Sequence, residues 1–228
     1  MLTECGFSSF RDLGCWSGVF GAGFFFFVHF PQIIYNFKRK STEGFSSLAV
    51  LLRIVGLSFH VFNSLVQNLE FQYVLTGILL LIENFVYVLQ FIVYRKKKSY
   101  LFAIFLVFPA LFLAVFYPET VESTNWINSF TQIVGYIPYL ALCIIHGTTK
   151  GISMFGQHLN YCGSVCGIIM CSISCNCSST TWSFYVISLF QSLSVFLLGL
   201  MYEEYRFLDK EADKSIPDVM TLMELNPK

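Results

Sequence analysis

Long apolar segments alternate with short polar ones along nearly the whole chain. Spanning the hydrocarbon core of a membrane takes about 20 mostly apolar residues. By that measure the pattern predicts seven transmembrane helices, at residues 14–37, 46–67, 71–94, 100–117, 127–146, 152–173 and 182–202. The fourth segment is short, rich in phenylalanine and interrupted by Pro109. We therefore expect an all-α membrane protein.

The basic residues fall almost entirely in alternate connections between these segments. Lys38–Lys40 follow the first segment, Arg95–Lys98 the third and Lys150 the fifth, and more basic residues follow the seventh. Seven crossings would place all of them on one side of the membrane. Because Lys and Arg are enriched in cytoplasmic loops, we predict a lumenal N-terminus (1–13) and a cytosolic tail (203–228).

Composition supports a lipid environment. The chain has 228 residues, of which 55% are hydrophobic and 12% are charged, whereas a soluble domain carries roughly 25% charged residues. Its formal net charge is zero, and no basic-aromatic surface pattern suggests nucleic acid as a partner. The partners that we expect are the lipid bilayer and a small polar solute.

Eight cysteines occupy two kinds of position. Those inside apolar segments most simply serve as small packing residues: Cys143, Cys162, Cys166 and Cys171. Those near one predicted membrane face leave a disulfide open as an alternative: Cys5, Cys15, Cys175 and Cys177. We expect no metal site, because Cys175 and Cys177 lack the ligand spacing and the matching histidines of zinc sites.

A short pattern occurs twice, 107 positions apart. In each copy a proline near the end of an apolar segment is followed by a Ser/Thr-x-Gly-x-Ser turn. The equivalent pairs are Pro31 and Pro138, Ser41 and Thr148, Thr42 and Thr149, Gly44 and Gly151, Ser46 and Ser153, and Gly56 and Gly163. Matched helix interruptions in two halves of a membrane chain indicate a repeat-built transporter.

The duplication divides the chain into two units of three predicted spans, at 14–94 and 127–202. A unit of three spans ends on the side opposite its start, so a direct copy would be inverted in the membrane. The segment 100–117 restores the original direction, and we predict that it is a linker helix between two parallel repeats.

These residues resemble the two motifs of the PQ-loop family. The first is Phe30-Pro31-Gln32 with the turn at 40–46, and the second is the degenerate Ile137-Pro138-Tyr139 with the turn at 148–153. That family includes the cystine carrier cystinosin, lysosomal exporters of cationic amino acids and the mannose-P-dolichol utilization defect protein. SWEET sugar transporters and the KDEL receptor are similar more distantly.

The resemblance implies two parallel three-helix bundles around a central substrate path, with Pro31 and Pro138 as hinges. Proline chemistry favours the same role, because each ring removes a helical hydrogen bond and clashes with the preceding turn. The alternative is a static kink. One departure concerns the second motif, where proton-coupled relatives carry an aspartate and this chain has His158 and Asn160.

The second predicted span carries one polar stripe on an otherwise apolar helix. Its members fall within about 80° of a helical projection: Arg53, Gly56, His60, Asn63 and Gln67. Such a stripe must face a cavity or a protein partner, because lipid would leave its polar groups unsatisfied. Asn160 is the equivalent of Arg53 in the second half.

Glu83 is the only acid deep within a predicted span. Burying a lone charge in lipid is costly, so we expect Glu83 to lie near Arg53. Three roles stay open for it: half of a structural ion pair, a contact to the solute, or a proton carrier that would couple transport to a pH gradient.

The function predicted from these features is a multi-pass solute carrier of an organelle membrane, lysosomal or endoplasmic reticulum. It would move an amino acid or a sugar by alternating access. The predicted solute contacts are Gln32, Asn36, Arg53, His60, Asn63, Glu83, Tyr139 and Asn160. The alternative is a non-transporting endomembrane factor or cargo receptor. We predict neither an enzyme nor a cofactor, because no catalytic motif is visible.

Overall fold

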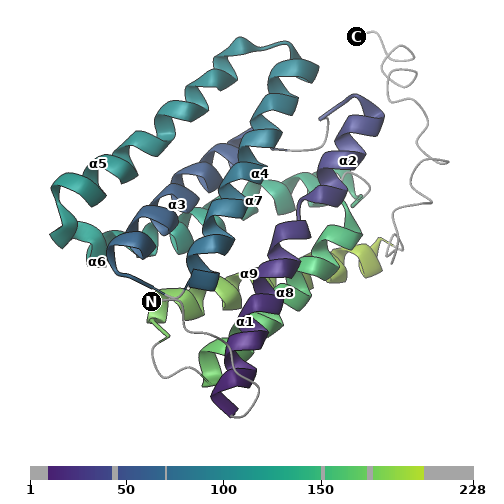
Figure 1. The fold of residues 1–228 in the computed structure, drawn as a ribbon. Coiled ribbons are helices and arrows are strands. Elements are labelled where there is room, and N and C mark those ends of the chain that lie inside the picture. Colours follow the sequence, from purple (N-terminus) through teal and green to yellow (C-terminus); the bar gives the residue numbers. More distant parts are fainter. Residues whose placement is uncertain (1–9, 43–45, 70, 150–151, 174–176, 203–228) are drawn as a thin grey trace, which may run out of the picture.

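A computed structural model describes residues 10–42, 46–69, 71–149, 152–173 and 177–202, and every regular element in these ranges is a helix (Figure 1). The first half contains α1 (Phe10–Phe27), α2 (Phe30–Arg39), α3 (Ser47–Val66) and α4 (Phe71–Arg95). The second half contains α7 (Trp126–His146), α8 (Met154–Ile173) and α9 (Ser179–Met201). Between them lie η1 (Lys98–Val107), α5 (Phe108–Phe116), η2 (Pro118–Thr120) and α6 (Val121–Thr124).

Six runs within the described ranges are long and apolar enough to cross a membrane. They are Asp12–Arg39, Ser47–Val66, Phe71–Arg95, Lys98–Phe116, Pro118–Ile145 and Ser179–Met201. The sixth predicted segment, 152–173, is the 20-residue helix α8, which is not among these runs. Its first turns carry Gln157, His158 and Asn160, and polar residues of this kind lower the mean hydropathy of a helix.

The first apolar segment is broken in its middle. Val28 and His29 separate α1 from α2, and Pro31 lies in the first turn of α2, where a missing N–H does no harm. Helix α7, in contrast, runs through Pro138 without interruption. The two motif prolines, expected to be equivalent, therefore differ: only the first copy divides its helix.

The last serine of each motif caps the helix that follows it, α3 in the first half and α8 in the second. The Ser46 hydroxyl accepts a hydrogen bond from the backbone N–H of Ala49, at 3.3 Å. The Ser153 hydroxyl accepts one from the N–H of Gly156, at 3.1 Å. Capping satisfies a donor that a helix start otherwise leaves unpaired, which explains why a serine ends both turns.

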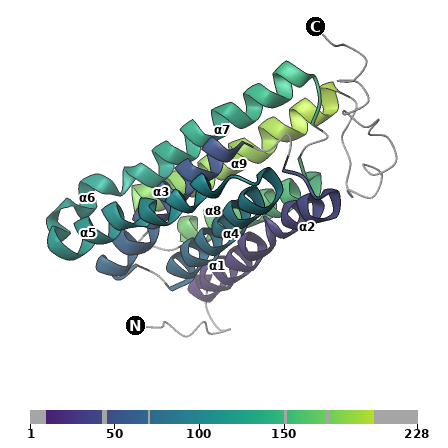
Figure 2. The same cartoon turned by 90° about the horizontal axis from the view of Figure 1, so that it is seen from above.

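The six long helices of the two halves pack in a closed cycle. Helix α4 lies between α1 and α3, and α9 lies between α7 and α8. The halves meet where α1 packs on α8 and where α3 packs on α7 (Figure 2). Helices η1 and α5 pack on the outside of this cycle, against α3 and, for η1, α4 as well. We call the end where α2 and α4 finish, at Arg39 and Arg95, the basic end.

The two contacts between the halves repeat the same register. A Cβ added at Gly135 on α7 would lie 3.3 Å from the carbonyl oxygen of Ala49 on α3. One added at Gly156 on α8 would lie 2.7 Å from the carbonyl oxygen of Val28, at the end of α1. Ala49 and Gly156 are 107 positions apart, and so are Val28 and Gly135. Backbones thus approach closely at equivalent points on both sides of the cycle.

A second pair of close approaches also occurs at positions that are 107 residues apart. A Cβ at Gly56 would collide with the Thr131 hydroxyl of α7, and a Cβ at Gly163 would lie 3.3 Å from the Cβ of Phe24 on α1. Thr131 and Phe24 are again 107 positions apart. Small residues at such crossings are what close helix packing in membranes requires.

Candidate functional site

A cavity of about 120 Å³ lies at the centre of the helix cycle. It is lined by α3, α4, α7, α8 and α9, by Gln32 of α2, by Ser153 before α8 and by the α1–α2 break. Most of its lining residues form pairs that are 107 positions apart. These pairs are Val28 and Gly135, His29 and Tyr136, Ala49 and Gly156, Val50 and Gln157, Arg53 and Asn160, and Asn84 and Gln191. The cavity therefore forms where equivalent surfaces of the two halves face each other.

The side chains at these equivalent positions are chemically different. Arg53 on α3 faces the cavity opposite its neutral counterpart Asn160 on α8. Amide and phenol groups provide most of the remaining polar lining, and no Asp or Glu is among the lining residues that the structure describes. The duplicated scaffold thus surrounds a cavity whose single guanidinium comes from the first half.

Three lining residues have a buried polar atom without a hydrogen-bond partner among the described residues. These atoms are Nε2 of His29, Nη1 of Arg53 and Oε1 of Gln132. Buried polar groups in proteins are nearly always paired, so each exception needs an explanation. One cation, one acceptor and one imidazole nitrogen around the same space are suited to a small polar ligand.

At the basic end, Gln32 connects the two motifs. Its Oε1 accepts a hydrogen bond from the backbone N–H of Ser153, at 2.8 Å, and its Nε2 donates to Oδ1 of Asn36, at 3.0 Å. Asn36 Nδ2 donates in turn to Oε1 of Gln90 on α4, at 3.0 Å. Gln32 and Asn36 are both buried. This chain of amides joins the first proline motif to the turn of the second and bounds the cavity on that side.

On the α7–α9 side, the lining consists of a network of amide and hydroxyl groups. Gln132 Nε2 donates to the hydroxyl of Ser188 at 2.7 Å and to Oε1 of Gln191 at 3.2 Å. Gln191 Nε2 donates to the Gln132 carbonyl oxygen at 3.1 Å, and the Tyr136 hydroxyl donates to the Gln191 carbonyl oxygen. These bonds fix the Gln132 side chain, so that its unpaired Oε1 is held in place.

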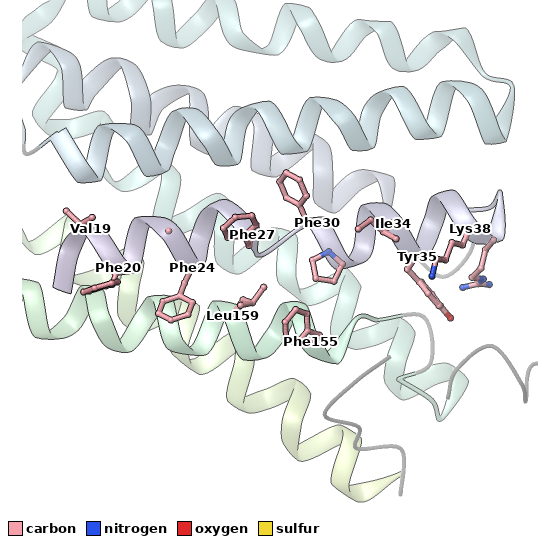
Figure 3. A pocket seen from close by; sticks show the side chains of 13 residues that line it. Val19, Phe20, Phe24, Phe27, Phe30, Ile34, Tyr35, Lys38, Phe155 and Leu159 are labelled. Carbon is pink, nitrogen blue, oxygen red and sulfur yellow. The ribbon is translucent and has the colours of Figure 1, made fainter. Parts of the chain in front are cut away.

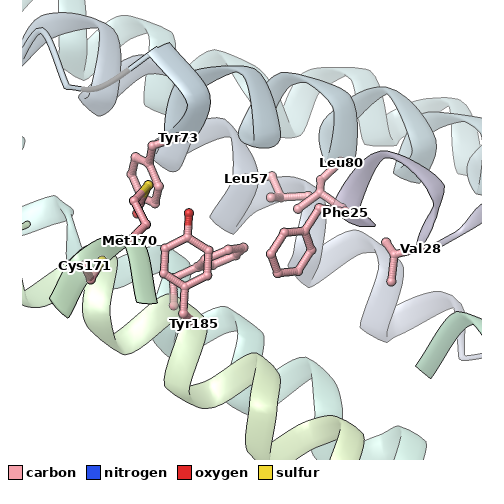
Figure 4. Close-up of a cluster of buried hydrophobic side chains, with 9 residues drawn as sticks. Phe25, Val28, Leu57, Tyr73, Leu80, Met170, Cys171 and Tyr185 are labelled. Carbon is pink, nitrogen blue, oxygen red and sulfur yellow. The ribbon is translucent and has the colours of Figure 1, made fainter. Parts of the chain in front are cut away.

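Toward the opposite end, a cluster of buried apolar side chains adjoins the cavity (Figure 4). Phe25 from α1, Tyr73 from α4 and Tyr185 from α9 are among its members. The ring centres of Phe25 and Tyr185 are 6.0 Å apart, and those of Tyr73 and Tyr185 are 6.4 Å apart. Val28 and Leu80 belong both to this cluster and to the cavity lining.

Of the side chains predicted to contact a solute, Gln32, Arg53 and Asn160 line the cavity. Asn160 also donates from Nδ2 to the Ser192 hydroxyl, at 2.8 Å. Asn36 lies one hydrogen bond behind Gln32 and does not line the cavity. For Tyr139, the side chain is outside the described part of the structure.

His60 and Asn63 are not among the lining residues; His60 lies where α3 meets α7, and Asn63 lies where α3 meets α6. Asn128 Nδ2 and His60 Nδ1 are 3.1 Å apart, and Asn63 Nδ2 donates to the hydroxyl of Thr124, at 3.0 Å. The polar stripe of α3 therefore faces protein over most of its length and reaches the cavity only at Arg53.

Glu83 and Arg53, which we expect to lie near one another, make no hydrogen bond to each other. Neither carboxylate oxygen of Glu83 has a hydrogen-bond partner among the described residues, and Arg53 Nη1 has none there either. Glu83 is buried on α4 without lining the cavity. Tyr87, one turn further along α4, lies close enough to interact electrostatically with both groups and itself lines the cavity.

The predicted contact set omits several polar residues that line the cavity, among them His29, Asn84, Gln132 and Gln191. The repeat offset links two of these residues, because Gln191 is the equivalent of Asn84 in the second half. Gln132 has an apolar counterpart, Phe25, so the same rule does not identify it.

The cysteines differ partly from the prediction. Cys171, expected to be a packing residue, forms a disulfide with Cys177, and Cys15 is also disulfide-bonded. Cys5 and Cys175 are outside the described residues. Over the described ranges, no group of three or more His, Cys, Asp and Glu residues is arranged to hold a metal ion.

Comparison with known proteins identifies the repeat. A family model described as "PQ loop repeat" matches residues 13–73. Two proteins of Saccharomyces cerevisiae are similar to the chain over part of its length. The vacuolar lysine transporter YPQ1 is 35% identical over 78 residues, which covers 31% of this chain. The vacuolar histidine transporter YPQ3 is 32% identical over 72 residues, which covers 32% of this chain.

The aligned parts cover 25% of the first transporter and 24% of the second, so the chain spans about a quarter of the length of the curated relatives it matches. Both relatives are named as transporters and neither as an enzyme. Together with the apolar helices, these matches identify the chain as a multi-pass membrane protein with a PQ-loop repeat at residues 13–73.

Proposed function

We propose that this protein is a membrane carrier for a small amino acid, which binds in the central cavity between the two halves. The observation that supports this most directly is the set of unpaired groups around one space, on His29, Arg53 and Gln132. Arg53 would bind the carboxylate, and the side-chain Oε1 of Gln132 would accept from the ammonium group. A sugar has no anionic group for Arg53, so an amino acid fits the site better.

The proposed scaffold consists of two parallel three-helix bundles, residues 14–94 and 127–202, joined by a linker at 100–117. Two features support it: the closed cycle of helices and the repeated close approaches between the halves. Helix α8 would be added to the six runs given above and bring the number of spans to seven. Its 20 residues at 1.5 Å per residue reach about 30 Å, the thickness of the hydrocarbon core.

Alternating access would open the cavity at one end at a time. The chain of amides from Gln32 to Ser153 would be the barrier at the basic end, and the aromatic cluster around Tyr73 and Tyr185 would be the barrier at the other. A volume of about 120 Å³ corresponds to roughly four water molecules. Binding an amino acid would therefore require the halves to separate slightly, so that solute binding and the movement of the halves would be coupled.

The hinge would lie at the α1–α2 break rather than equally at both motif prolines. Val28 and His29 interrupt the helix beside the cavity, and interrupted helices in membranes are tolerated where they face protein or a water-filled space. Pro31 starts the second segment. Pro138 lies inside a continuous helix, and we propose a smaller rotation there.

We place the basic end in the cytosol, following the distribution of Lys and Arg, and we place the protein in an endomembrane, as its vacuolar relatives suggest. Glu83 remains our candidate for proton coupling, because it is a buried carboxyl group close to the cavity residue Tyr87.

Uptake of labelled solutes into liposomes that contain the purified protein tests the proposal. The panel consists of amino acids, including lysine and histidine, and neutral sugars, each measured with and without a pH gradient. Saturable uptake of an amino acid supports a carrier, and stimulation by an acidic donor side supports Glu83 as a proton carrier. No flux of any solute, with lipid-linked sugar or a protein partner copurifying, would favour the non-transporting endomembrane factor instead.

A further inference from the structure

A second hollow of about 1000 Å³ lies outside the helix cycle, along the outer faces of α1, α2 and α8 (Figure 3). It follows the broken first span from Val19 on α1 to Arg39 at the end of α2. On the other side it is bounded by Phe155 and Leu159 of α8. This hollow is separate from the central cavity, since the two share no lining residue.

The hollow results from local sequence features. The break at Val28 and His29 separates α1 from α2, and Pro31 lies in the first turn of α2. Gly23 leaves its wall open, because a Cβ added there would meet no atom within 4 Å. A larger side chain at this position would fill the hollow without disturbing the packing of the helices.

The chemistry of the lining changes along its length. Phe20, Phe27 and Ile34 provide an apolar wall, and each is at least half exposed. The end of the hollow carries Lys38 and Arg39, with the Arg39 guanidinium 5.0 Å from the centre of the Tyr35 ring. An apolar channel that ends in two cations matches a molecule with a hydrocarbon chain and a negatively charged head.

The dimensions fit one leaflet of a membrane. From Phe27 to Lys38 the chain advances by about 16 Å at the helical rise of 1.5 Å per residue. That is close to half of a hydrocarbon core that is about 30 Å thick. A chain lying against Phe27 would therefore bring its phosphate to the level of Lys38 and Arg39.

We propose that this hollow binds an anionic phospholipid. One acyl chain lies along the aromatic wall of α1 and α2, and the headgroup, with its phosphate and its net negative charge, lies at Lys38 and Arg39. Basic residues at the membrane surface attract anionic headgroups, and the break in the first span provides the space for the chain. The lipid would then sit directly against the hinge segment, where it could stabilise one orientation of α2.

Retention of lipid by the purified full-length protein tests this site. The protein in detergent is incubated with equal amounts of phosphatidylserine and phosphatidylcholine that have identical chains, and bound lipid is counted by native mass spectrometry. We expect phosphatidylserine to be retained at least about tenfold more, because each basic residue at a lipid surface favours an anionic headgroup by roughly fivefold.

Two pairs of variants separate the headgroup contact from the chain contact. Lys38→Gln with Arg39→Gln should reduce the preference to about equal retention, whereas Lys97→Gln with Lys98→Gln, exposed at the same end, should leave it unchanged. Gly23→Leu should lower the retention of both lipids several-fold. Val93→Phe, on the exposed face of α4, should not.

Equal retention of the two lipids by the unmodified protein would overturn the proposal. The proposal would also be overturned if the double variant of Lys97 and Lys98 lost the preference for phosphatidylserine as fully as the double variant of Lys38 and Arg39. The third contradicting result is that Gly23→Leu retains as much lipid as Val93→Phe. Cholesterol or a polyprenyl phosphate that displaces phosphatidylserine at equal concentration would assign the hollow to that molecule instead.

Discussion

Replacing Arg53 with glutamine removes the positive charge of the central cavity while a polar side chain remains. In the proposed carrier, this guanidinium binds the solute carboxylate. Two opposite charges about 4 Å apart attract by about 4 kcal/mol at an effective dielectric constant near 20. The glutamine amide would recover roughly 1 kcal/mol through a hydrogen bond. A net loss of about 2–3 kcal/mol corresponds to roughly a 30- to 150-fold weaker affinity.

The same change should not destabilise the protein. Arg53 Nη1 has no hydrogen-bond partner among the described residues, so the substitution breaks no bond there and relieves a buried charge. Arg95 provides the contrast, because its guanidinium donates to the Thr42 hydroxyl at 3.0 Å and to the Thr42 carbonyl oxygen at 2.9 Å. Arg95→Gln should lower the thermal stability without changing which solute is preferred.

The assay compares pairs of solutes that differ only in the carboxylate, histidine with histamine and lysine with cadaverine. In liposomes, the unmodified protein should take up the amino acid of at least one pair and discriminate against its amine. Arg53→Gln should raise KM for the amino acid and remove the discrimination, with the amount of inserted protein unchanged. An unaltered KM in Arg53→Gln, or efficient uptake of histamine by the unmodified protein, would refute the assignment of Arg53 to the carboxylate.

Three further predictions follow from the packing of the two halves. Gln32→Ala should cost about 1 kcal/mol in the closed state by removing the hydrogen bond to the Ser153 N–H, so a thiol probe added at the basic end should react faster with a cysteine introduced at the cavity residue Val50; unchanged labelling would exclude a gate there. Gly56→Ala should destabilise the protein by about 1–3 kcal/mol through overpacking, and adding Thr131→Ala should restore part of the melting temperature; no rescue would contradict the close crossing of α3 and α7 at this point. Pro31→Ala should slow uptake more than Pro138→Ala, with both proteins inserted; equal rates would remove the asymmetric hinge.

The sequence predicts the helices of this protein well because lipid imposes a simple rule on length and polarity. Helices α3 and α4 begin and end within a residue or two of the predicted 46–67 and 71–94. The repeat offset of 107 predicts which positions are equivalent, and equivalent positions meet at the cavity. Helix α8 differs from the others because polar side chains near the cavity lower its hydropathy.

The site is less predictable because a helical projection gives a face but not the level along the axis. Arg53 and Asn63 share a stripe, yet ten residues separate them by about 15 Å. Only Arg53 reaches the cavity; Asn63 lies beside Thr124 instead. The energy of burying charges likewise predicts that Arg53 and Glu83 lie near one another, but it does not determine the rotation of α3 against α4. Only the structure shows that the two side chains make no hydrogen bond to each other.

Cross-linking the two motifs at the basic end tests the alternating cavity most directly. Cysteines replace Gln32 and Ser153, whose side-chain oxygen and backbone nitrogen are 2.8 Å apart, and a short reversible thiol reagent joins them in liposomes. The single-cysteine variants, treated identically, serve as controls. We predict that amino-acid uptake by the double variant stops on cross-linking and returns on reduction. Uptake that continues at full rate while the pair is completely cross-linked would contradict an alternating cavity.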